Sequence, residues 1–204
     1  MPSTPTTTHP RLVLGSTSVY RRDLLQRLRL SFEVAAPNVD EAPRPGERPE
    51  TLAWRLALEK AREVATRRPG AVVIGADQVA DLAGQALGKP GNHARAVAQL
   101  QALRGQSVVF HTAVAVLRPD IGFEQVQVAP VRVRFRDLSD ADIERYLALE
   151  QPYDCAGSAK CETLGIALLE VIESDDPTAL VGLPLIRTCR MLREAGIDVL
   201  GAAA

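Results

Sequence analysis

The sequence predicts an α/β protein built on one mixed sheet that is flanked by helices and long enough to divide the molecule into two lobes. Short apolar runs alternate with amphipathic segments, an order typical of strands alternating with helices. Ala71–Ala76 is a continuous apolar run of the kind found in strands buried on both faces. Val108–Leu117 and Val126–Phe135 are long β-branched runs joined around Pro119–Gly122, which adds an antiparallel component.

Two strands and two helices are predicted before the buried run. Leu12–Leu14 is an apolar strand, and Ser18–Leu28 is a helix with Ser18 as its candidate N-cap. Phe32–Ala35 is predicted as a short strand. A proline-rich loop separates it from Glu50–Arg67, a long amphipathic helix.

The part of the chain after the buried run begins with a hairpin and ends with a helix. Val79–Leu82 and Gln85–Leu87 flank Ala83-Gly84, which predicts a hairpin. The remaining predicted elements are the helices Asn92–Leu103, Asp137–Leu149 and Leu183–Glu194 and the strand Ile166–Val171. Asp142 stands three residues after Ser139, which is close to a capping box.

The composition is that of an ordinary globular protein. Of the 204 residues, 46% are hydrophobic and 24% charged, and the net charge of −1 argues against a nucleic-acid polymer as partner. Residues 1–10 are predicted to be a disordered tail and not a signal peptide, which leaves 11–204 as a single domain. No run approaches the length of a membrane span, and three cysteines without CxxC spacing favour a reducing compartment, so we expect a cytoplasmic protein.

The turn between the first strand and the first helix is a candidate phosphate site. Ser16, Thr17 and Ser18 offer hydroxyls and free backbone N–H groups at a helix N-terminus, which attracts anions. Arg21 and Arg22 follow in the first helical turn, where the helix dipole favours acids, and cations there suggest a bound polyanion. A capped helix with solvated arginines would have the same sequence.

Three more residues are candidates for the same cleft. Asp77 directly follows Ala71–Ala76, at the strand end where open α/β sheets bind ligands, although a turn aspartate would also fit. Lys60 continues an apolar i+4 stripe on the helix Glu50–Arg67, so its amine lies on or beside the buried face unless it snorkels to water. Lys89 leaves a strand into a turn and can point a cation into the cleft.

Asp40-Glu41, on the loop after the short strand, are candidate ligands for a hard cation. Mg²⁺ takes oxygen ligands and keeps several waters, although a solvated acidic turn has the same residues. The three histidines lack metal-ligand spacing, and the sequence has no Walker A or GxSxG motif. Together the candidates describe a cleft with cations for phosphates and carboxylates for a metal and a water.

On these residues the chain resembles the Maf family of nucleoside triphosphate pyrophosphatases, from about Leu12 to Leu200. Seven motifs in order carry the resemblance: Ser16–Arg22, Val39–Glu41, Leu58–Ala61, Gly75–Val79, Gly88–Pro90, Cys155–Ser158 and Val181–Leu185. The resemblance implies a fold like that of Maf proteins and inosine triphosphatases, with the active-site cleft between two lobes. It also implies hydrolysis between the α- and β-phosphates, a divalent cation such as Mg²⁺ or Mn²⁺, and a homodimer.

The resemblance also implies roles for individual residues. By matched position, Asp77 is the proton acceptor and, with Glu41, a metal ligand. The residues that match substrate-binding positions are Ser16, Ser18, Arg21, Lys60 and Lys89. Tyr20, Gln78 and Glu162 match the positions whose residues differ between family branches that act on different substrates.

Within the family the chain is most similar to the branch that acts on 7-methyl-GTP, although Tyr20 stands where that branch usually has Trp. Glu162 can accept both Watson–Crick donors of 7-methylguanine, and Tyr20 can stack on the cationic ring. The expected function is hydrolysis of 7-methyl-GTP to 7-methyl-GMP and pyrophosphate, which would clear a modified nucleotide. The alternatives are a pyrophosphatase for dTTP, UTP or another noncanonical nucleotide, and a non-catalytic nucleotide-binding regulator of cell division.

Overall fold

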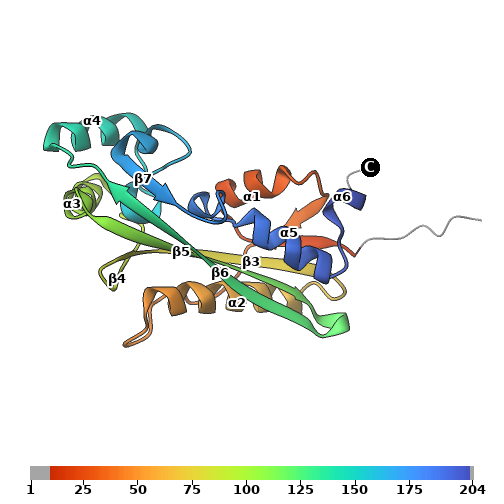
Figure 1. Cartoon of the computed structure of the whole chain (residues 1–204). Coiled ribbons are helices and arrows are strands. Elements are labelled where there is room, and N and C mark those ends of the chain that lie inside the picture. The colour runs from red at the N-terminus through yellow and green to blue at the C-terminus, as the bar shows by residue number, and fades with distance from the viewer. Residues whose placement is uncertain (1–9, 203–204) are drawn as a thin grey trace, which may run out of the picture.

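The computed structural model describes residues 10–202, so the predicted tail, apart from Pro10, lies outside the described residues (Figure 1). One sheet contains β1 Leu12–Gly15, β2 Phe32–Val34, β3 Val72–Leu82, β4 Gln85–Leu87, β5 Ser107–Arg118, β6 Phe123–Phe135 and β7 Leu169–Glu173. The helices are α1 Val19–Gln26, α2 Pro49–Thr66, α3 His93–Leu103, α4 Asp140–Glu150, α5 Leu185–Glu194 and α6 Val199–Ala202. Between residues 10 and 202, no helix has the length and apolar character needed to cross a membrane.

The sheet is mixed and elongated. Its strand order is β2-β1-β3-β5-β6-β7, and β4 pairs with the end of β3 in the predicted hairpin. β1 runs parallel to β2 and β3, whereas β5, β6 and β7 extend the sheet by antiparallel pairing. The long strands β3, β5 and β6 run through both ends of the molecule (Figure 1). The predicted α/β fold with a mixed sheet is confirmed.

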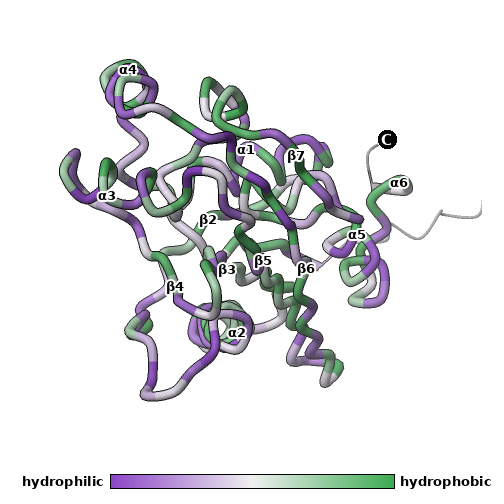
Figure 2. The backbone as a smooth tube through the Cα atoms, turned by 60° about the vertical axis from the view of Figure 1, so that its left-hand side comes forward, coloured by the Kyte–Doolittle hydropathy of each residue, from purple (hydrophilic) through white to green (hydrophobic). Residues whose placement is uncertain are grey.

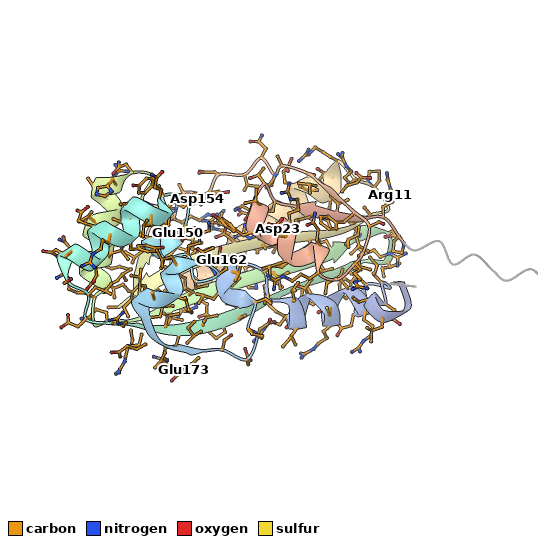
Figure 3. The ribbon with its side chains drawn as sticks, turned by 90° about the horizontal axis from the view of Figure 1, so that it is seen from above. Arg11, Asp23, Glu150, Asp154, Glu162 and Glu173 are labelled. Carbon is orange, nitrogen blue, oxygen red and sulfur yellow. The ribbon has the colours of Figure 1, made fainter. Side chains whose placement is uncertain are left out.

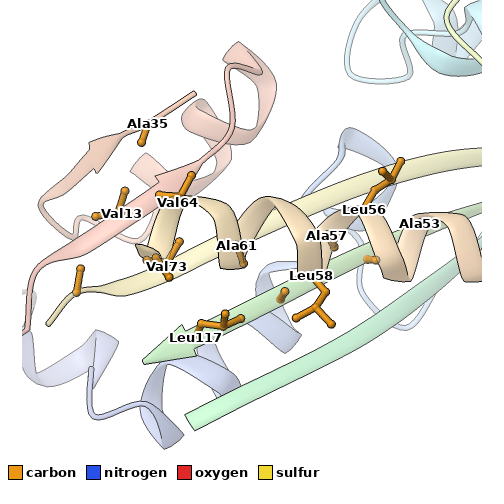
Figure 4. Close-up of a cluster of buried hydrophobic side chains, with 14 of the residues drawn as sticks. Val13, Ala35, Ala53, Leu56, Ala57, Leu58, Ala61, Val64, Val73 and Leu117 are labelled. Carbon is orange, nitrogen blue, oxygen red and sulfur yellow. The ribbon is translucent and has the colours of Figure 1, made fainter. Parts of the chain in front are cut away.

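The core divides into three clusters along this sheet, and the central strands β3 and β5 are largely hydrophobic (Figure 2). α2 packs on one face, against alternate residues such as Val73 (Figure 4). α1 and α5 pack on the opposite face, against the neighbouring residues Val72 and Ile74. The third cluster joins α3 and α4 to the beginning of β5 and the end of β6. The long strands thus connect two differently packed ends, in line with the two predicted lobes.

The prediction that Asp77 follows the end of a strand is wrong, because β3 is one strand of 11 residues that includes it. The parallel pairing with β1 does stop near that point, at Gly15 and Gly75. β5 pairs with β3 from Val73 to Asp81, however, and this ladder keeps the backbone extended. Asp77 therefore lies beyond the end of β1, on a strand that is supported from its other side.

The predicted strand Ile166–Val171 is also placed wrongly. Leu164–Leu168 forms a 3₁₀ turn, and β7 begins only at Leu169. A Cβ on Gly165 would lie 2.5 Å from the backbone nitrogen of Lys160, so this segment is folded tightly back on the preceding loop. The apolar run alone does not distinguish such a turn from a strand.

Several predicted element ends shift by a few residues. α1 ends at Gln26, two residues before the predicted Leu28. α5 begins at Leu185, after Pro184, and α4 begins at Asp140 behind the N-cap Ser139. The Ser139 and Asp142 side chains form the complete capping box that their spacing indicated.

Gly75 allows α2 to approach β3 closely. A Cβ on this residue would lie 2.3 Å from the Ala57 carbonyl oxygen and 2.6 Å from the Ala61 amide nitrogen. These are backbone atoms of α2, so no side-chain rotation relieves the contact, and Ala57 and Ala61 face the strand in Figure 4. The small residue sets the distance between helix and sheet, and with it the position of Lys60.

We expect Gly75→Ala to lower the free energy of unfolding by about 1–3 kcal/mol, the usual cost of overpacking a core. The matched control is Gly88→Ala, because a Cβ there meets nothing within 4 Å. That control should change the free energy by no more than about 0.5 kcal/mol. Urea denaturation of both variants measures the difference, and equal stabilities would show that α2 can move away from the sheet without cost.

Candidate active site

The ten site residues that the family resemblance implies line one cavity of about 520 Å³, whereas the candidates Arg22 and Asp40 do not line it. The ten residues are Ser16, Ser18, Tyr20, Arg21, Glu41, Lys60, Asp77, Gln78, Lys89 and Glu162. They come from the β1–α1 turn, the first turn of α1, the loop before α2, α2 itself, β3, the segment after β4 and the segment before β7. The volume is in the range of small-molecule sites. The fold therefore brings the candidates together, while their individual roles remain predictions.

The β1–α1 turn borders the cavity with the N-terminal end of α1. Ser18 is the N-cap, as predicted, and its hydroxyl accepts a hydrogen bond from the Arg21 amide. Buried Ser16 accepts from the Ser18 amide at 3.2 Å and from Arg21 Nη1 at 3.4 Å. Burial lowers the pKa of Arg21, although the charges of Asp77 and Glu41 act in the opposite direction. The turn thus presents an ordered cation beside capped backbone donors.

The two arginines of α1 do not act as a pair. Arg21 points into the cavity and its Nε donates to the Gly182 carbonyl oxygen at 2.9 Å. Arg22 is exposed and lies 3.5 Å from Asp23. Successive residues of a helix face directions about 100° apart, so only one of the two can enter the cavity. The polyanion hypothesis therefore applies to Arg21 alone.

Lys60 joins the two predicted acidic residues. Its Nζ lies 2.7 Å from Glu41 Oε1 and 2.7 Å from Asp77 Oδ1. Lys60 is only 4% exposed, so the ammonium does not snorkel to open solvent but is satisfied inside the cavity wall. Burial raises the pKa of Glu41, but the hydrogen bond and charge of Lys60, with Lys89 and Arg21, outweigh it and lower the pKa below its usual value.

We name Arg21, Lys60 and Lys89, with Glu41 and Asp77 between them, the cationic end of the cavity. Lys89 is exposed and lines the wall formed by the segment after β4. Within the described residues it has no ion-pair partner within 4.0 Å. Such a side chain can turn towards an anionic ligand at little cost.

The acidic end of the cavity is formed by Asp154 and Glu162 around Tyr20, and Figure 3 shows both carboxylates in the same region. The Tyr20 hydroxyl donates to Asp154 Oδ2 at 3.3 Å, and burial and nearby acids raise the pKa of Tyr20. Lys160 Nζ lies 5.4 Å from the centre of the Tyr20 ring and also pairs with Glu150. Tyr20 borders the cavity, so a ligand can contact the ring from that side.

Gln78 supports the wall of the cavity. Its Nε2 lies 2.9 Å from Thr112 Oγ1 and 3.0 Å from the carbonyl oxygens of Ala179 and Leu180. Thr112 Oγ1 donates to the same Ala179 oxygen at 2.9 Å. Gln78, which was predicted to distinguish the substrate branches of the family, is therefore hydrogen-bonded to the segment that leads to Gly182.

Two carboxylates of the cavity could bind a divalent cation, but they do not make a complete metal site on their own. Among residues 10–202, no group of three or more His, Cys, Asp and Glu side chains is placed to hold a metal. Glu41 and Asp77 do converge on one cation, the Lys60 ammonium, with one oxygen each. Mg²⁺ commonly uses one or two carboxylates together with substrate phosphates and waters. Two carboxylates fit a site of this kind, which phosphate groups of a ligand and water molecules would complete.

Two residues of this region were missed by the sequence reasoning. Asp154 stands beside Cys155–Ser158, a motif that was recognised, but a lone exposed acid gives no signal. Arg55 lies outside the cavity and binds the loop that carries Glu41. A buried arginine on the apolar face of an amphipathic helix is a signal that could have been noticed, because arginine is rarely buried without partners.

The comparisons with known proteins agree with the resemblance found in the sequence. A model of the family described as Maf-like protein matches residues 11–195. A protein of Albidiferax ferrireducens named 7-methyl-GTP pyrophosphatase is 68% identical over 192 residues, covering 94% of this chain and 96% of the relative. Proteins of that name from a Polaromonas species and from Cupriavidus metallidurans are 69% and 56% identical, covering 94% and 96% of this chain and 88% and 98% of their own. The chain therefore belongs to the Maf family.

Proposed function

We propose that this chain is a nucleoside triphosphate pyrophosphatase that hydrolyses 7-methyl-GTP to 7-methyl-GMP and pyrophosphate. The observation that carries the proposal is one cavity with a cationic end and an acidic end. A triphosphate suits the first, and a positively charged base suits the second, because each meets charge of the opposite sign. The relatives named 7-methyl-GTP pyrophosphatase, at 56–69% identity, support the same substrate.

In the proposed reaction a water molecule attacks the α-phosphorus. The new P–O bond forms as the bond to the bridging oxygen of the β-phosphate breaks, and pyrophosphate leaves. Asp77 accepts the proton of the water. Lys60 holds one oxygen of Asp77 and leaves the other available for that water. Arg21 and Lys89 offset the phosphate charge. A divalent cation held by Glu41 and Asp77 would neutralise charge on the leaving pyrophosphate.

The acidic end provides the basis for choosing the base. The ring of 7-methylguanine is cationic and presents two adjacent N–H donors, which one carboxylate can accept together. Glu162 lines the cavity with an exposed carboxylate that can do so. Tyr20 offers a ring face for stacking on the cavity side. Thymine and uracil have neither the charge nor this pair of donors.

A panel of triphosphates with Mg²⁺ or Mn²⁺, read by pyrophosphate release, tests the proposal directly. We expect kcat/KM to be highest for 7-methyl-GTP among 7-methyl-GTP, GTP, dTTP and UTP, and we expect EDTA to abolish turnover. Nucleotide binding without release of pyrophosphate would instead indicate the alternative function, a non-catalytic nucleotide-binding regulator of cell division. Higher kcat/KM for dTTP or UTP would indicate the other branch of the family.

Glu162→Gln should reduce kcat/KM for 7-methyl-GTP by roughly 5- to 150-fold, which corresponds to about 1–3 kcal/mol for an unsatisfied donor. Glutamine keeps the shape of the side chain but loses its charge, and its NH₂ group faces one N–H of the base. Activity on dTTP and UTP should hold or rise. The control is Glu173→Gln, which changes an exposed carboxylate outside the cavity (Figure 3). An unchanged ratio of 7-methyl-GTP to UTP activity would remove Glu162 from substrate selection.

We also propose that the protein acts in the cytoplasm. All three cysteines are unpaired thiols, in keeping with a reducing compartment. Burial raises the pKa of Cys155 and of Cys161 to about 12, so these thiols beside the acidic end are neutral. The homodimer implied by the family resemblance remains a prediction.

A further inference from the structure

Polar contacts with α2 hold the loop that carries Glu41. This loop joins β2 to α2 and is largely exposed. On one side of Glu41, the Asn38 amide donates to Glu63 Oε2 at 3.1 Å. On the other side, the Ala42 carbonyl oxygen accepts from Arg55 Nη2 at 3.1 Å. The Glu41 side chain is itself 59% exposed, so its own packing does little to determine its position.

All three nitrogen atoms of the Arg55 guanidinium donate hydrogen bonds. Its Nε and Nη2 donate to the two carboxylate oxygens of Glu47 at 2.6 and 2.8 Å, in a bidentate pair. Its Nη1 donates to Glu59 Oε2 at 3.0 Å. Arg55 is 7% exposed and the Glu47 side chain 6% exposed, so water competes little for these bonds. The guanidinium thus holds the loop at Ala42 and at Glu47, while Glu59 holds the guanidinium.

Arg44 adds a second connection of the same kind. Its amide donates to Glu47 Oε2 at 2.9 Å, and its guanidinium donates to Glu59 Oε1 at 2.9 Å. Two cations and two carboxylates thus form a closed network between the loop and one turn of α2. The next residue of that turn is Lys60, which binds the Glu41 carboxylate. One stretch of helix therefore fixes both the backbone beside Glu41 and the end of its side chain.

We propose that Arg55 is a positioning residue: its guanidinium holds the Ala42 carbonyl and the Glu47 carboxylate, and so keeps the Glu41 carboxylate near Lys60 and Asp77, where Glu41 and Asp77 would hold a divalent cation. The proposal rests on the proposed function, because it assigns Arg55 to the metal-binding step of that reaction. Arg55 touches neither the cavity nor any reacting atom. It acts through the loop alone.

The same helix supplies a matched control. Arg62 of α2 makes a bidentate pair with Glu124 of β6, at 2.9 and 2.5 Å, but binds no atom of the Glu41 loop. Arg55→Lys and Arg62→Lys are therefore the same substitution in two bidentate pairs on one helix. Lysine is a point charge on a flexible stem and cannot replace the fork that binds a carboxylate and a carbonyl at once.

Two measurements on the full chain test the proposal. The first is amide hydrogen exchange of residues 40–46 in the ligand-free protein, which we expect to be at least tenfold faster in Arg55→Lys and unchanged in Arg62→Lys. The second is Mn²⁺ binding, followed by the electron paramagnetic resonance of free Mn²⁺ with the α,β-methylene analogue of 7-methyl-GTP. We expect Arg55→Lys to raise the half-saturating Mn²⁺ concentration about tenfold while kcat at saturating Mn²⁺ stays within threefold of wild type.

The exchange measurement depends on neither turnover nor metal, so it separates this proposal from the proposed function. Equal exchange of residues 40–46 in Arg55→Lys and Arg62→Lys would overturn the positioning role even if the enzyme is active. Faster exchange in Arg55→Lys would support it even if no nucleotide is hydrolysed. A loss of kcat at saturating Mn²⁺ with unchanged half-saturation would also overturn it, because loop position would then not control metal binding.

Discussion

Asp77→Asn is expected to reduce turnover of 7-methyl-GTP by about 10²–10⁴-fold, the usual contribution of a general base. Asparagine cannot accept the proton of the attacking water at neutral pH. Its Oδ1 can still accept the hydrogen bond that Lys60 Nζ gives to Asp77 at 2.7 Å, so the site should keep its shape. The affinity for a non-hydrolysable analogue, measured by calorimetry, should change far less than kcat.

Asp81→Asn is the matched control for this prediction. Asp81 lies on the same strand four residues further on, but it pairs with His111 and does not line the cavity. Pyrophosphate release by this variant should stay near that of wild type. If Asp77→Asn also released pyrophosphate at a near-wild-type rate, another group would have to accept the proton.

Much of the site could be predicted because its parts are encoded locally. The i+4 apolar stripe placed Lys60 on the buried side of α2, and the structure shows it 4% exposed. Ser18 was recognisable as an N-cap from its place before an apolar helix, and it caps α1. The burial of Lys60 follows from a repeating pattern of apolar residues, and the N-cap follows from residue types only three positions apart. Both patterns can be recognised in a single sequence.

What could not be predicted depends on contacts between distant segments. The sequence predicts strands on both sides of Asp77, at Ala71–Ala76 and Val79–Leu82. It does not indicate that they form one continuous strand, because the pairing with β5 that joins them links residues about 30 positions apart. The bonds from Gln78 to Ala179 and Leu180 span about 100 positions. The 2.7 Å contact between Lys60 and Asp77 likewise depends on how closely α2 approaches β3, which Gly75 determines. The sequence placed Lys60 and Asp77 in one cleft by their residue types and positions, and the family resemblance added Gln78 to the predicted site.

Lys60→Met is expected to lower the free energy of unfolding by roughly 3–5 kcal/mol, the cost of removing one partner of a buried ion pair. Methionine replaces the stem of the lysine but leaves Asp77, with a side chain only 10% exposed, without its cation. Glu41 can turn to solvent, so most of the cost arises at Asp77. The value should lie towards the lower limit, because Asp77 borders the cavity and water can reach it. Urea denaturation measures the change, and kcat/KM should fall with it.

Two further variants show whether the lower stability of Lys60→Met comes from the loss of the buried ion pair or from the loss of a lysine side chain as such. Lys89→Met makes the same substitution at an exposed position of the same cavity, and it should change stability by no more than about 0.5 kcal/mol. The double variant Lys60→Met, Asp77→Asn removes the unpaired charge, so it should be more stable than Lys60→Met alone although it carries one more substitution. If the double variant is instead the less stable of the two, the destabilisation comes from packing of the lysine stem, and the Lys60–Asp77 pair contributes little to the fold.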